Sequence, residues 1–354
     1  MRIGLISQNF LESIALRSGV GPTPIILGFW GLGACRTIMA GVRLGVFDAL
    51  AGPKGRKGKS ADDLARELEC DPTGMETLLN ALVGYGYLVR RDHLYRNRSL
   101  AERWLTTDSK SSLKHMLLFF YQVWGYMDSV EEAVRGRETI PLLHDPARSP
   151  ELWEHYLRGL AELARHQSWE MVRRVPIPKA PRSLLDVGGG HGMFSVAFCR
   201  YYKTLNAEVL ELAPAIPIGR RIVAEQKMDH RVRFREGDLR EADFGSGHDA
   251  ILLFVLVHHF SPEDVQRLVK KSYHALRPGG TLAIFEPEHR GRGNEVTQGG
   301  GMMELIFFLT SRARAYPEKT LCGWLEEARF EQVQTHRLLT APMTVLITGR
   351  RPSD

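Results

Sequence analysis

The sequence predicts an α/β protein that is built on a mostly parallel sheet and preceded by a smaller, mostly helical domain. Its stretch 183–192, SLLDVGGGHG, has the pattern of a buried strand that enters a tight turn and then a helix. From there to residue 286, strand-like and helix-like segments alternate, which is typical of a parallel sheet with crossover helices. Before it, prolines at positions 176, 178 and 181 make a stiff break that marks a domain boundary.

Length and composition describe a globular protein. The 354 residues suffice for two domains, and 44% apolar with 25% charged residues is a normal soluble composition. The 47 basic residues exceed the 41 acidic ones only mildly and are scattered over the chain, so we expect no nucleic-acid partner. The four cysteines lie far apart without a CxxC pair, which fits a reducing cytoplasm and signals neither a disulfide framework nor a zinc site.

The N-terminal segment shows no targeting pattern. It carries only Arg2 as an early positive charge and reaches Glu12 before any long apolar core, unlike a secretory signal. The most apolar early run, 24–35, is too short to span a bilayer and is followed by Arg36 and Arg43. We therefore expect no membrane-spanning segment.

Residues 1–110 are expected to form a mostly helical, winged-helix-like domain. The apolar residues between 23 and 50 suggest helices with wide apolar faces, and such faces need a partner. The expected elements after them are a basic, glycine-rich loop at 52–59, a helix 61–68 capped by Ser60, a helix 72–83 capped by Asp71, and strands 87–89 and 93–96.

A winged helix raises the possibility of DNA binding, which its second helix disfavours. A recognition helix needs Arg, Lys, Asn or Gln to contact phosphates and bases. The stretch 73–83 has no Lys or Arg and offers only Asn80. We expect the fold without the DNA function.

Residues 111–180 are predicted to form a helical connector rich in aromatic side chains. Each aromatic residue alone can be ordinary helix-packing core, but as a group they suggest the roof of an apolar pocket. Phe120 and Trp124 are the two assigned to the substrate.

Residues 181–354 are predicted to form the α/β domain. In such a sheet, ligands bind at the carboxyl ends of the strands. The expected elements are a buried strand in which Leu184 and Leu185 lead to Asp186, followed by helix 193–202, strand 207–212, helix 216–226, strand 232–236, strand 250–256, helix 262–276 and strand 281–286.

The glycine turn carries an acid, Asp186, two residues before its first glycine, Gly188. Glycines such as Gly188 and Gly190 let the backbone adopt φ > 0 and approach a ligand closely. A carboxylate would repel a pyrophosphate but can pair with an ammonium or sulfonium group. The ligand suggested is therefore S-adenosylmethionine.

Two further acids fall at strand ends. Glu211 closes the second strand and is placed to accept the ribose hydroxyls of an adenosine. Asp238, followed by Leu239, comes after the third strand and is placed to accept from the adenine amino group. Each alone can be a solvated loop acid, but their joint placement favours a nucleoside site.

The chain resembles the plant-type and bacterial small-molecule O-methyltransferases, the family of the caffeate, acetylserotonin and polyketide enzymes. The resemblance covers nearly the whole chain and rests on the segments 28–30, 44–50, 186–192, 257–261 and 324–330. It implies a winged-helix-like domain used for homodimerisation, followed by a Rossmann-like domain that binds S-adenosylmethionine and releases S-adenosylhomocysteine. It also implies cofactor contacts at Gly188, Glu211, Asp238 and Leu239.

In this family the general base is the histidine that follows an apolar strand, which is His258 here. An imidazole suits this task because side chains of this type have a pKa of about 6.5 and are mostly neutral at pH 7. His259 is expected on the opposite side of an extended backbone. The flanking acids of the family correspond to Glu286 and to Glu318, although Glu318 can also be a first-turn helix acid.

A helix near residue 300 is expected to line the acceptor pocket. Met303, Ile306 and Phe307 recur at i, i+3 and i+4, which places them on one helix face. In the family the corresponding helix lines the pocket for the aromatic substrate, and a plain core stripe is the alternative.

The chain departs from the family pattern at three positions. His259 stands where plant members usually have Asp, Phe254 where Lys or Arg is common, and Arg329 where a glycine is common. His258, His259 and His289 raise the possibility of a metal, but they form no recognised ligand spacing, so we expect none.

The sequence predicts a cytoplasmic, homodimeric, S-adenosylmethionine-dependent O-methyltransferase of an aromatic small molecule. Three alternatives stay open. One is methyl transfer to carbon or nitrogen, and another is a related fold that uses the cofactor for decarboxylation, hydroxylation or a pericyclic step. The third is a ligand-sensing DNA-binding regulator.

Overall fold

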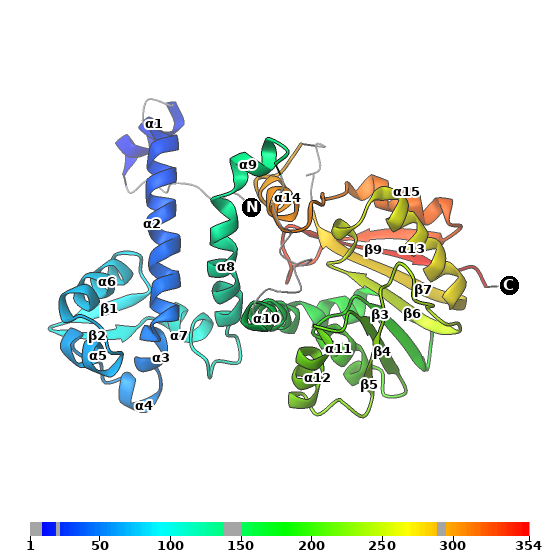
Figure 1. Ribbon diagram of the computed structural model, residues 1–354, viewed down its shortest axis with the longest axis horizontal. Helices are drawn as coiled ribbons and strands as arrows, with labels where there is room; N and C mark the ends of the chain where they lie inside the picture. Colours follow the sequence, from blue (N-terminus) through cyan, green and yellow to red (C-terminus); the bar gives the residue numbers. More distant parts are fainter. Residues whose placement is uncertain (1–8, 19–21, 138–149, 289–294, 354) are drawn as a thin grey trace. The chain divides into compact units, whose positions relative to one another are not determined.

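The computed structural model describes residues 9–18, 22–137, 150–288 and 295–353. Contacts divide the chain into two compact units, with the division between Tyr121 and Gln122 (Figure 1). The predicted helices and strands are present in both units, but the predicted loop 52–59 begins with a short helix at Gly52–Gly55, one turn long.

The N-terminal unit is a set of helices with one small hairpin. As predicted, Ser60 Oγ accepts from the backbone N–H of Asp63 at 3.1 Å, and Asp71 Oδ1 accepts from Gly74 at 2.7 Å. The elements are α1 (Phe10–Ser18), α2 (Thr23–Arg43), α3 (Val46–Ala49), α4 (Gly52–Gly55), α5 (Ala61–Glu67), α6 (Pro72–Gly84), β1 (Leu88–Arg91), β2 (Leu94–Asn97) and α7 (Ser99–Trp104).

Helix α2 is long and apolar, and much of it is exposed. Its 21 residues are long and apolar enough to cross a membrane by length and composition alone, which the sequence analysis did not foresee. Its buried residues, among them Met39 and Val42, lie near its C-terminal end, whereas Ile25, Phe29 and Trp30 are each more than half exposed. Most of the helix therefore presents an apolar surface that the unit itself does not cover.

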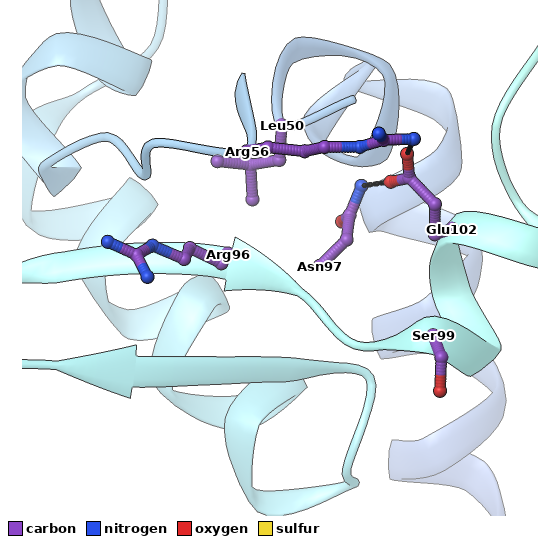
Figure 2. A pocket seen from close by; sticks show the side chains of 6 residues that line it. All are labelled: Leu50, Arg56, Arg96, Asn97, Ser99 and Glu102. Carbon is purple, nitrogen blue, oxygen red and sulfur yellow. Dashed lines mark hydrogen bonds and ion pairs between the residues drawn. The ribbon is translucent and has the colours of Figure 1, made fainter. Parts of the chain in front are cut away.

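The N-terminal unit also holds a cavity of about 300 Å³ beside α7 (Figure 2). In it, the Arg56 guanidinium and the Asn97 amide both contact the Glu102 carboxylate, at 3.3 and 3.0 Å. None of the predicted site residues lines this cavity. This cavity is therefore not the predicted site.

The C-terminal unit is built around a seven-stranded sheet, and α8 (Lys114–Met127) crosses the boundary between the units. The strand order is β5-β4-β3-β6-β7-β9-β8. The elements are α9 (Val130–Val134), α10 (Pro150–Arg174), β3 (Ser183–Val187), α11 (Met193–Tyr201), β4 (Asn206–Glu211), α12 (Ile216–Glu225), β5 (Val232–Glu236), β6 (His248–Phe254), the 3-10 turn η2 (Val257–His259), α13 (Pro262–Ala275), β7 (Leu276–Pro287), α14 (Gln298–Ser311), α15 (Glu318–Glu327), β8 (Glu331–His336) and β9 (Thr344–Arg350).

The strands from β3 to β7 pair in parallel, and β9 and β8 add an antiparallel edge. The chain moves outward from β3 through β4 and β5, and then returns to place β6 on the other side of β3. Where the strand order reverses in this way, a crevice opens beyond the carboxyl ends of the two central strands. The site is therefore expected beyond β3 and β6.

Two hydrophobic cores cover the two faces of this sheet. Alternate residues of β6 show the division, because Leu252 and Phe254 pack with α10, α11 and α12, whereas Ile251 and Leu253 pack with α13 and α15. Burial on both faces explains why the sequence of β6 is a continuous apolar run. The two helix layers lie on opposite sides of the sheet in Figure 1.

Candidate active site

The turn after β3 brings the backbone into close approaches that only glycine allows. Gly188, Gly190 and Gly192 have φ values of +66°, +42° and +67°, in the left-handed region. At Gly189 the constraint is space, because a Cβ there would lie 2.4 Å from the carboxyl carbon of Asp186. The turn therefore closes directly over the end of β3.

Asp186 is fully buried beneath this turn. Its Oδ2 accepts a hydrogen bond of 2.8 Å from Ser195 Oγ, whereas its Oδ1 has no hydrogen-bond partner among the described residues. Burial raises the pKa of Asp186 to about 7, the Ser195 hydroxyl opposes this shift, and the carboxylate of Glu211 adds to it. A buried carboxyl oxygen without a donor is unfavourable, so a ligand that brings a hydrogen-bond donor or a cation to it is bound more tightly.

Glu211 ends β4, the neighbour of β3. Its Oε2 accepts from the backbone N–H of Gly190 at 2.9 Å and its Oε1 from that of Leu212 at 2.8 Å. Burial raises the pKa of Glu211, against the effect of these two donors. Two carboxyl groups, Asp186 and Glu211, thus flank the glycine turn.

Asp238 follows β5 and forms an ion pair within its own loop. Its Oδ2 accepts from Arg240 Nη2 at 2.6 Å and its Oδ1 from the backbone N–H of Arg240 at 3.0 Å. The hydrogen bond from Arg240 lowers the pKa of Asp238. Leu239 beside it is buried in the core that α13 covers.

His258 and Glu286 meet from the carboxyl ends of the neighbouring strands β6 and β7. His258 Nδ1 lies 2.6 Å from Glu286 Oε2, and both side chains are buried. The second oxygen, Oε1, accepts from the backbone N–H groups of Leu256 and Val257, both at 2.7 Å. Because a carboxylate can only accept, the neutral His258 imidazole has its proton on Nδ1 in this contact, which leaves the lone pair on Nε2. This nitrogen can take up a proton.

The backbone before this pair is strained at Val255. A β-branched residue rarely adopts φ > 0, but Val255 has φ +53°, and its N–H donates to Phe285 O at 2.7 Å. The left-handed residue turns the chain so that two successive N–H groups, those of Leu256 and Val257, converge on one carboxylate oxygen. In an extended strand, successive N–H groups point in opposite directions and could not share that acceptor.

The sequence-based placement of the histidine pair was wrong in one respect. β6 ends at Phe254, and both histidines lie in the turn η2. The backbone is not extended there, so His258 and His259 do not lie on opposite sides of a strand. The two rings are 4.1 Å apart, and His259 Nδ1 lies 2.8 Å from Ser311 Oγ. His259 is therefore fixed by α14 rather than by Glu286.

Two family models match this chain. Residues 133–327 match the O-methyltransferase domain, and residues 28–107 match the O-methyltransferase dimerisation domain. The first match alone covers more than half of the chain. The chain belongs to the O-methyltransferase family.

Curated relatives and solved structures agree with the family. A 3-hydroxy-5-methyl-1-naphthoate 3-O-methyltransferase of Streptomyces sahachiroi is 25% identical over 92% of this chain and 94% of its own length. An L-tyrosine C(3)-methyltransferase of Streptomyces lavendulae is 26% identical over 72% of each chain. The crystal structure of human N-acetylserotonin methyltransferase with S-adenosylmethionine has a TM-score of 0.81 at 20% identity, and the match covers 99% of this chain and 100% of that one. As predicted, this protein is an S-adenosylmethionine-dependent methyltransferase.

The residues at the glycine turn of this methyltransferase fit that cofactor. S-adenosylmethionine carries an ammonium group, a sulfonium group and ribose hydroxyls, which are cationic centres and hydrogen-bond donors. The turn offers the matching acceptors, because Asp186 Oδ1 has no donor among the described residues and Glu211 accepts only from backbone N–H groups there. The roles of Asp186, Gly188, Gly190 and Glu211 toward the cofactor stay predictions.

Of the predicted acceptor residues, Phe307 lies next to the proposed base. Its ring stacks on the His258 imidazole with centroids 3.7 Å apart and planes 14° from parallel. Met303 and Ile306 are half-buried on the same helix, α14. Trp124 is half-buried on α8, and Phe120, in the N-terminal unit, is 44% exposed. Their contacts with a substrate stay predictions.

Glu318 does not share the position of Glu286. It begins α15, and its carboxylate pairs with Arg337, which also pairs with Glu288. The contacts of His258 in the described part of the chain are with Glu286, His259 and Phe307. The alternative, that Glu318 is an acid of the first turn of a helix, therefore fits better than a role beside the base.

Two residues of this region, His191 and Leu256, were not singled out from the sequence, and a third, Tyr156, was expected only as one of the aromatic group of the connector. Met193 N donates to His191 Nδ1 at 2.9 Å, and burial lowers the pKa of His191 to about 3, so this imidazole is neutral with its proton on Nε2. Burial raises the pKa of the Tyr156 phenol on α10, and the carboxylates of Glu211 and Glu286 raise it further. Helix α10 lies beside the turn, because a Cβ at Gly190 would meet Leu157 at 2.9 Å. Leu256 packs on the turn, because a Cβ at Gly188 would meet it at 2.5 Å. Of His191 and Leu256, only His191, a lone imidazole within a glycine run, carried a signal in the sequence.

A metal site stays without support. Within the described ranges no group of three or more His, Cys, Asp and Glu side chains is placed to hold a metal ion. His258 and His259 are engaged with Glu286 and Ser311, and His289 lies outside the described residues.

Proposed function

We propose that this enzyme transfers the methyl group of S-adenosylmethionine to a hydroxyl oxygen of an aromatic or polyketide-like small molecule, with His258 as general base. The observation that carries the proposal is the buried His258–Glu286 pair, which leaves Nε2 of His258 as a proton acceptor. The naphthoate 3-O-methyltransferase among the relatives supports the acceptor class.

The protein's part in this reaction is to hold the cofactor, orient the acceptor and deprotonate its hydroxyl group. The bound cofactor supplies an electrophilic methyl group, so the acceptor oxygen needs to be aligned and to lose its proton. Glu286 fixes the imidazole tautomer and stabilises the imidazolium that forms when Nε2 takes the proton. The Phe307 ring restricts rotation of the imidazole by stacking on it.

Methyl transfer to a ring carbon is the second candidate. The tyrosine C(3)-methyltransferase among the relatives favours it, because an ortho carbon of a phenol also becomes nucleophilic when the hydroxyl is deprotonated. The same His258–Glu286 pair would serve both reactions. The position of the transferred methyl group decides between them.

Incubation with methyl-labelled S-adenosylmethionine and a panel of phenols, naphthols and polyketides tests the function. We expect the label in the product, and we expect NMR to show that it is attached to oxygen. Label on a ring carbon would select the second candidate. A product formed without transfer of the label would contradict both candidates and favour a cofactor use without methyl transfer.

Replacing Glu211 by alanine is expected to weaken binding of S-adenosylhomocysteine by about 1–3 kcal/mol, the range for a hydrogen bond to a charged group. Isothermal titration calorimetry measures the loss. Glu208→Ala is the matched control, because Glu208 lies on the same strand and pairs with Arg235 at 2.7 Å away from the turn. Equal affinity in both variants would remove Glu211 from the cofactor site.

We also propose that α1 and α2 form the interface of a homodimer. The dimerisation-domain match covers most of α2, and both helices expose apolar side chains that the unit leaves uncovered. The exposed residues are Phe10, Leu11, Ile14, Ile25, Leu27, Phe29, Trp30 and Leu32. This interface accounts for the apolar character of α2 without a membrane.

The remaining assignments are proposals of the same kind. The division into a dimerisation domain 1–110, a helical connector 111–180 and a cofactor-binding domain 181–354 stays a proposal; α10 of the connector packs on α11 and belongs to the same compact unit as the sheet. A cytoplasmic location fits the four free cysteines. The absence of a nucleic-acid partner fits Asn80, whose Oδ1 accepts from Tyr95 Oη at 2.8 Å inside the unit.

A further inference from the structure

A lysine from another element organises the loop that follows β5. Lys271 lies on α13, and its Nζ donates to the backbone oxygens of Leu239 at 2.9 Å and Ala242 at 2.7 Å, with a third contact to that of Arg240 at 3.4 Å. An ammonium group has three donors and no acceptor, so these carbonyls match its full hydrogen-bonding capacity. The loop 238–242 is thus folded around one side chain.

The charge of Lys271 is held without an acid in direct contact. In the part of the chain that the structure describes, no carboxylate lies within ion-pair distance of Nζ, and the ammonium packs over the Phe244 ring at 4.4 Å. Burial lowers the pKa of Lys271, and the acids nearby, Glu241 first, act in the opposite direction. Carbonyl dipoles and an aromatic face therefore hold this cation, as is typical of a structural rather than a solvated lysine.

The geometry of the loop links these contacts of Lys271 to the backbone positions of Asp238 and Leu239. The backbone oxygen of Asp238 accepts from the N–H groups of Glu241 at 2.9 Å and Ala242 at 2.7 Å, which closes a tight turn. This turn directs the following carbonyls to one side, where their mutual repulsion needs a cation. Without the ammonium, the carbonyls of residues 239, 240 and 242 would lose the donor that they share.

We propose that Lys271 is a positioning residue for the cofactor, one that fixes the adenine end of the site by holding the carbonyls of the 238–242 loop. The proposal rests on the assignment of Asp238 and Leu239 to that end, which is part of the proposed function. Lys271 itself does not touch the cofactor. It acts through the backbone of the residues that do.

Lys271→Met tests the proposal, because methionine keeps the apolar stem over Phe244 and removes the three donors. We expect the dissociation constant of S-adenosylhomocysteine to rise about tenfold, since hydrogen bonds to a charged group are lost. We expect the same factor for 5′-methylthioadenosine, which shares the adenosine but lacks the amino-acid end. The KM for S-adenosylmethionine should rise, while kcat at saturation and the KM for the acceptor stay unchanged.

Lys270→Met is the matched control, because Lys270 is the exposed neighbour on the same helix. It should leave both dissociation constants unchanged. Lys271→Arg is the second variant if Lys271→Met does not fold; its planar fork keeps the charge but matches three converging carbonyls poorly, so a smaller loss of the same kind is expected.

Two results would overturn the proposal. One is a lower melting temperature in Lys271→Met with unchanged affinity for both ligands, which would make the lysine purely structural. The other is a loss for S-adenosylhomocysteine alone, which would place the effect at the amino-acid end. Failure of the wild-type protein to bind either ligand would instead contradict the proposed cofactor site, so the two failures are distinguishable.

Discussion

Replacing Gly189 by alanine is expected to reduce the affinity for S-adenosylhomocysteine by about 100-fold or more, equivalent to about 2.7 kcal/mol. The new Cβ would lie 2.4 Å from the carboxyl carbon of Asp186 and 2.6 and 2.7 Å from its two oxygens. Asp186 is fully buried, so its side chain has no space to move into. Overpacking at such a site costs about 1–3 kcal/mol or more, and relief requires a shift of the glycine turn itself.

Gly323→Ala is the control for this substitution. Gly323 lies within α15, and a Cβ there would meet nothing within 4 Å. Alanine should stabilise the helix by about 0.4–1 kcal/mol and leave cofactor affinity unchanged. Calorimetry and thermal unfolding of both variants provide the comparison. Wild-type affinity in a normally folded Gly189→Ala protein would show that the turn does not hold the cofactor.

Replacing His258 by alanine is expected to lower kcat by about 10²–10⁴-fold at pH 7, the usual contribution of a general base. A phenol of pKa about 10 is almost fully protonated at that pH, so its proton must be removed during the reaction. Affinity for S-adenosylhomocysteine should change little, because His258 contacts Glu286, His259 and Phe307 rather than the glycine turn.

His259→Ala is the matched control. Both histidines lie in η2, but His259 is bonded to Ser311 and not to Glu286. Its replacement should therefore cost much less than that of His258. Steady-state rates on one phenol measure both effects. A larger loss in His259→Ala would move the base to that residue.

The parallel strands of the sheet could be predicted from the sequence, because they alternate with helices over most of that part of the chain. β5, with the bounds Val232–Glu236, was predicted to the residue, and α11, α12 and α13 to within one. β8 and β9 were missed. β8 lies at the edge of the sheet and has only exposed and half-buried residues, so it lacks a continuous apolar run. β9 is buried, but it follows β8 without a crossover helix and so falls outside the alternation of strands and helices.

The contact between His258 and Glu286 was expected from the family resemblance, and the structure contains it. The local geometry could not be foreseen, because it depends on Val255 in a conformation that its own propensity disfavours. Propensity continues the strand to Leu256, whereas tertiary contacts with Phe285 and Glu286 end it at Phe254. A strained residue next to a site is where local prediction fails.

Arg329 shows the same limit in another part of the unit. The family commonly has glycine at this position, and the structure gives Arg329 a φ of +67°, in the left-handed region. The departure was visible in the sequence, but its consequence for the backbone was not. Lys271 is similar, because its three carbonyl partners lie about 30 residues away and carry no sequence pattern.

The dependence of kcat on the acidity of the acceptor tests the central claim, that His258 removes the hydroxyl proton, most directly. Wild type and His258→Ala would be compared at saturating S-adenosylmethionine on phenols with pKa values from about 10 down to about 7, and on one phenol as the pH rises toward 10. If His258 is the base, the deficit of the variant shrinks steadily along both series, because the acceptor increasingly arrives ionised. A deficit that stays constant across both series, or near wild-type turnover of the variant on the least acidic phenol at pH 7, would contradict the claim.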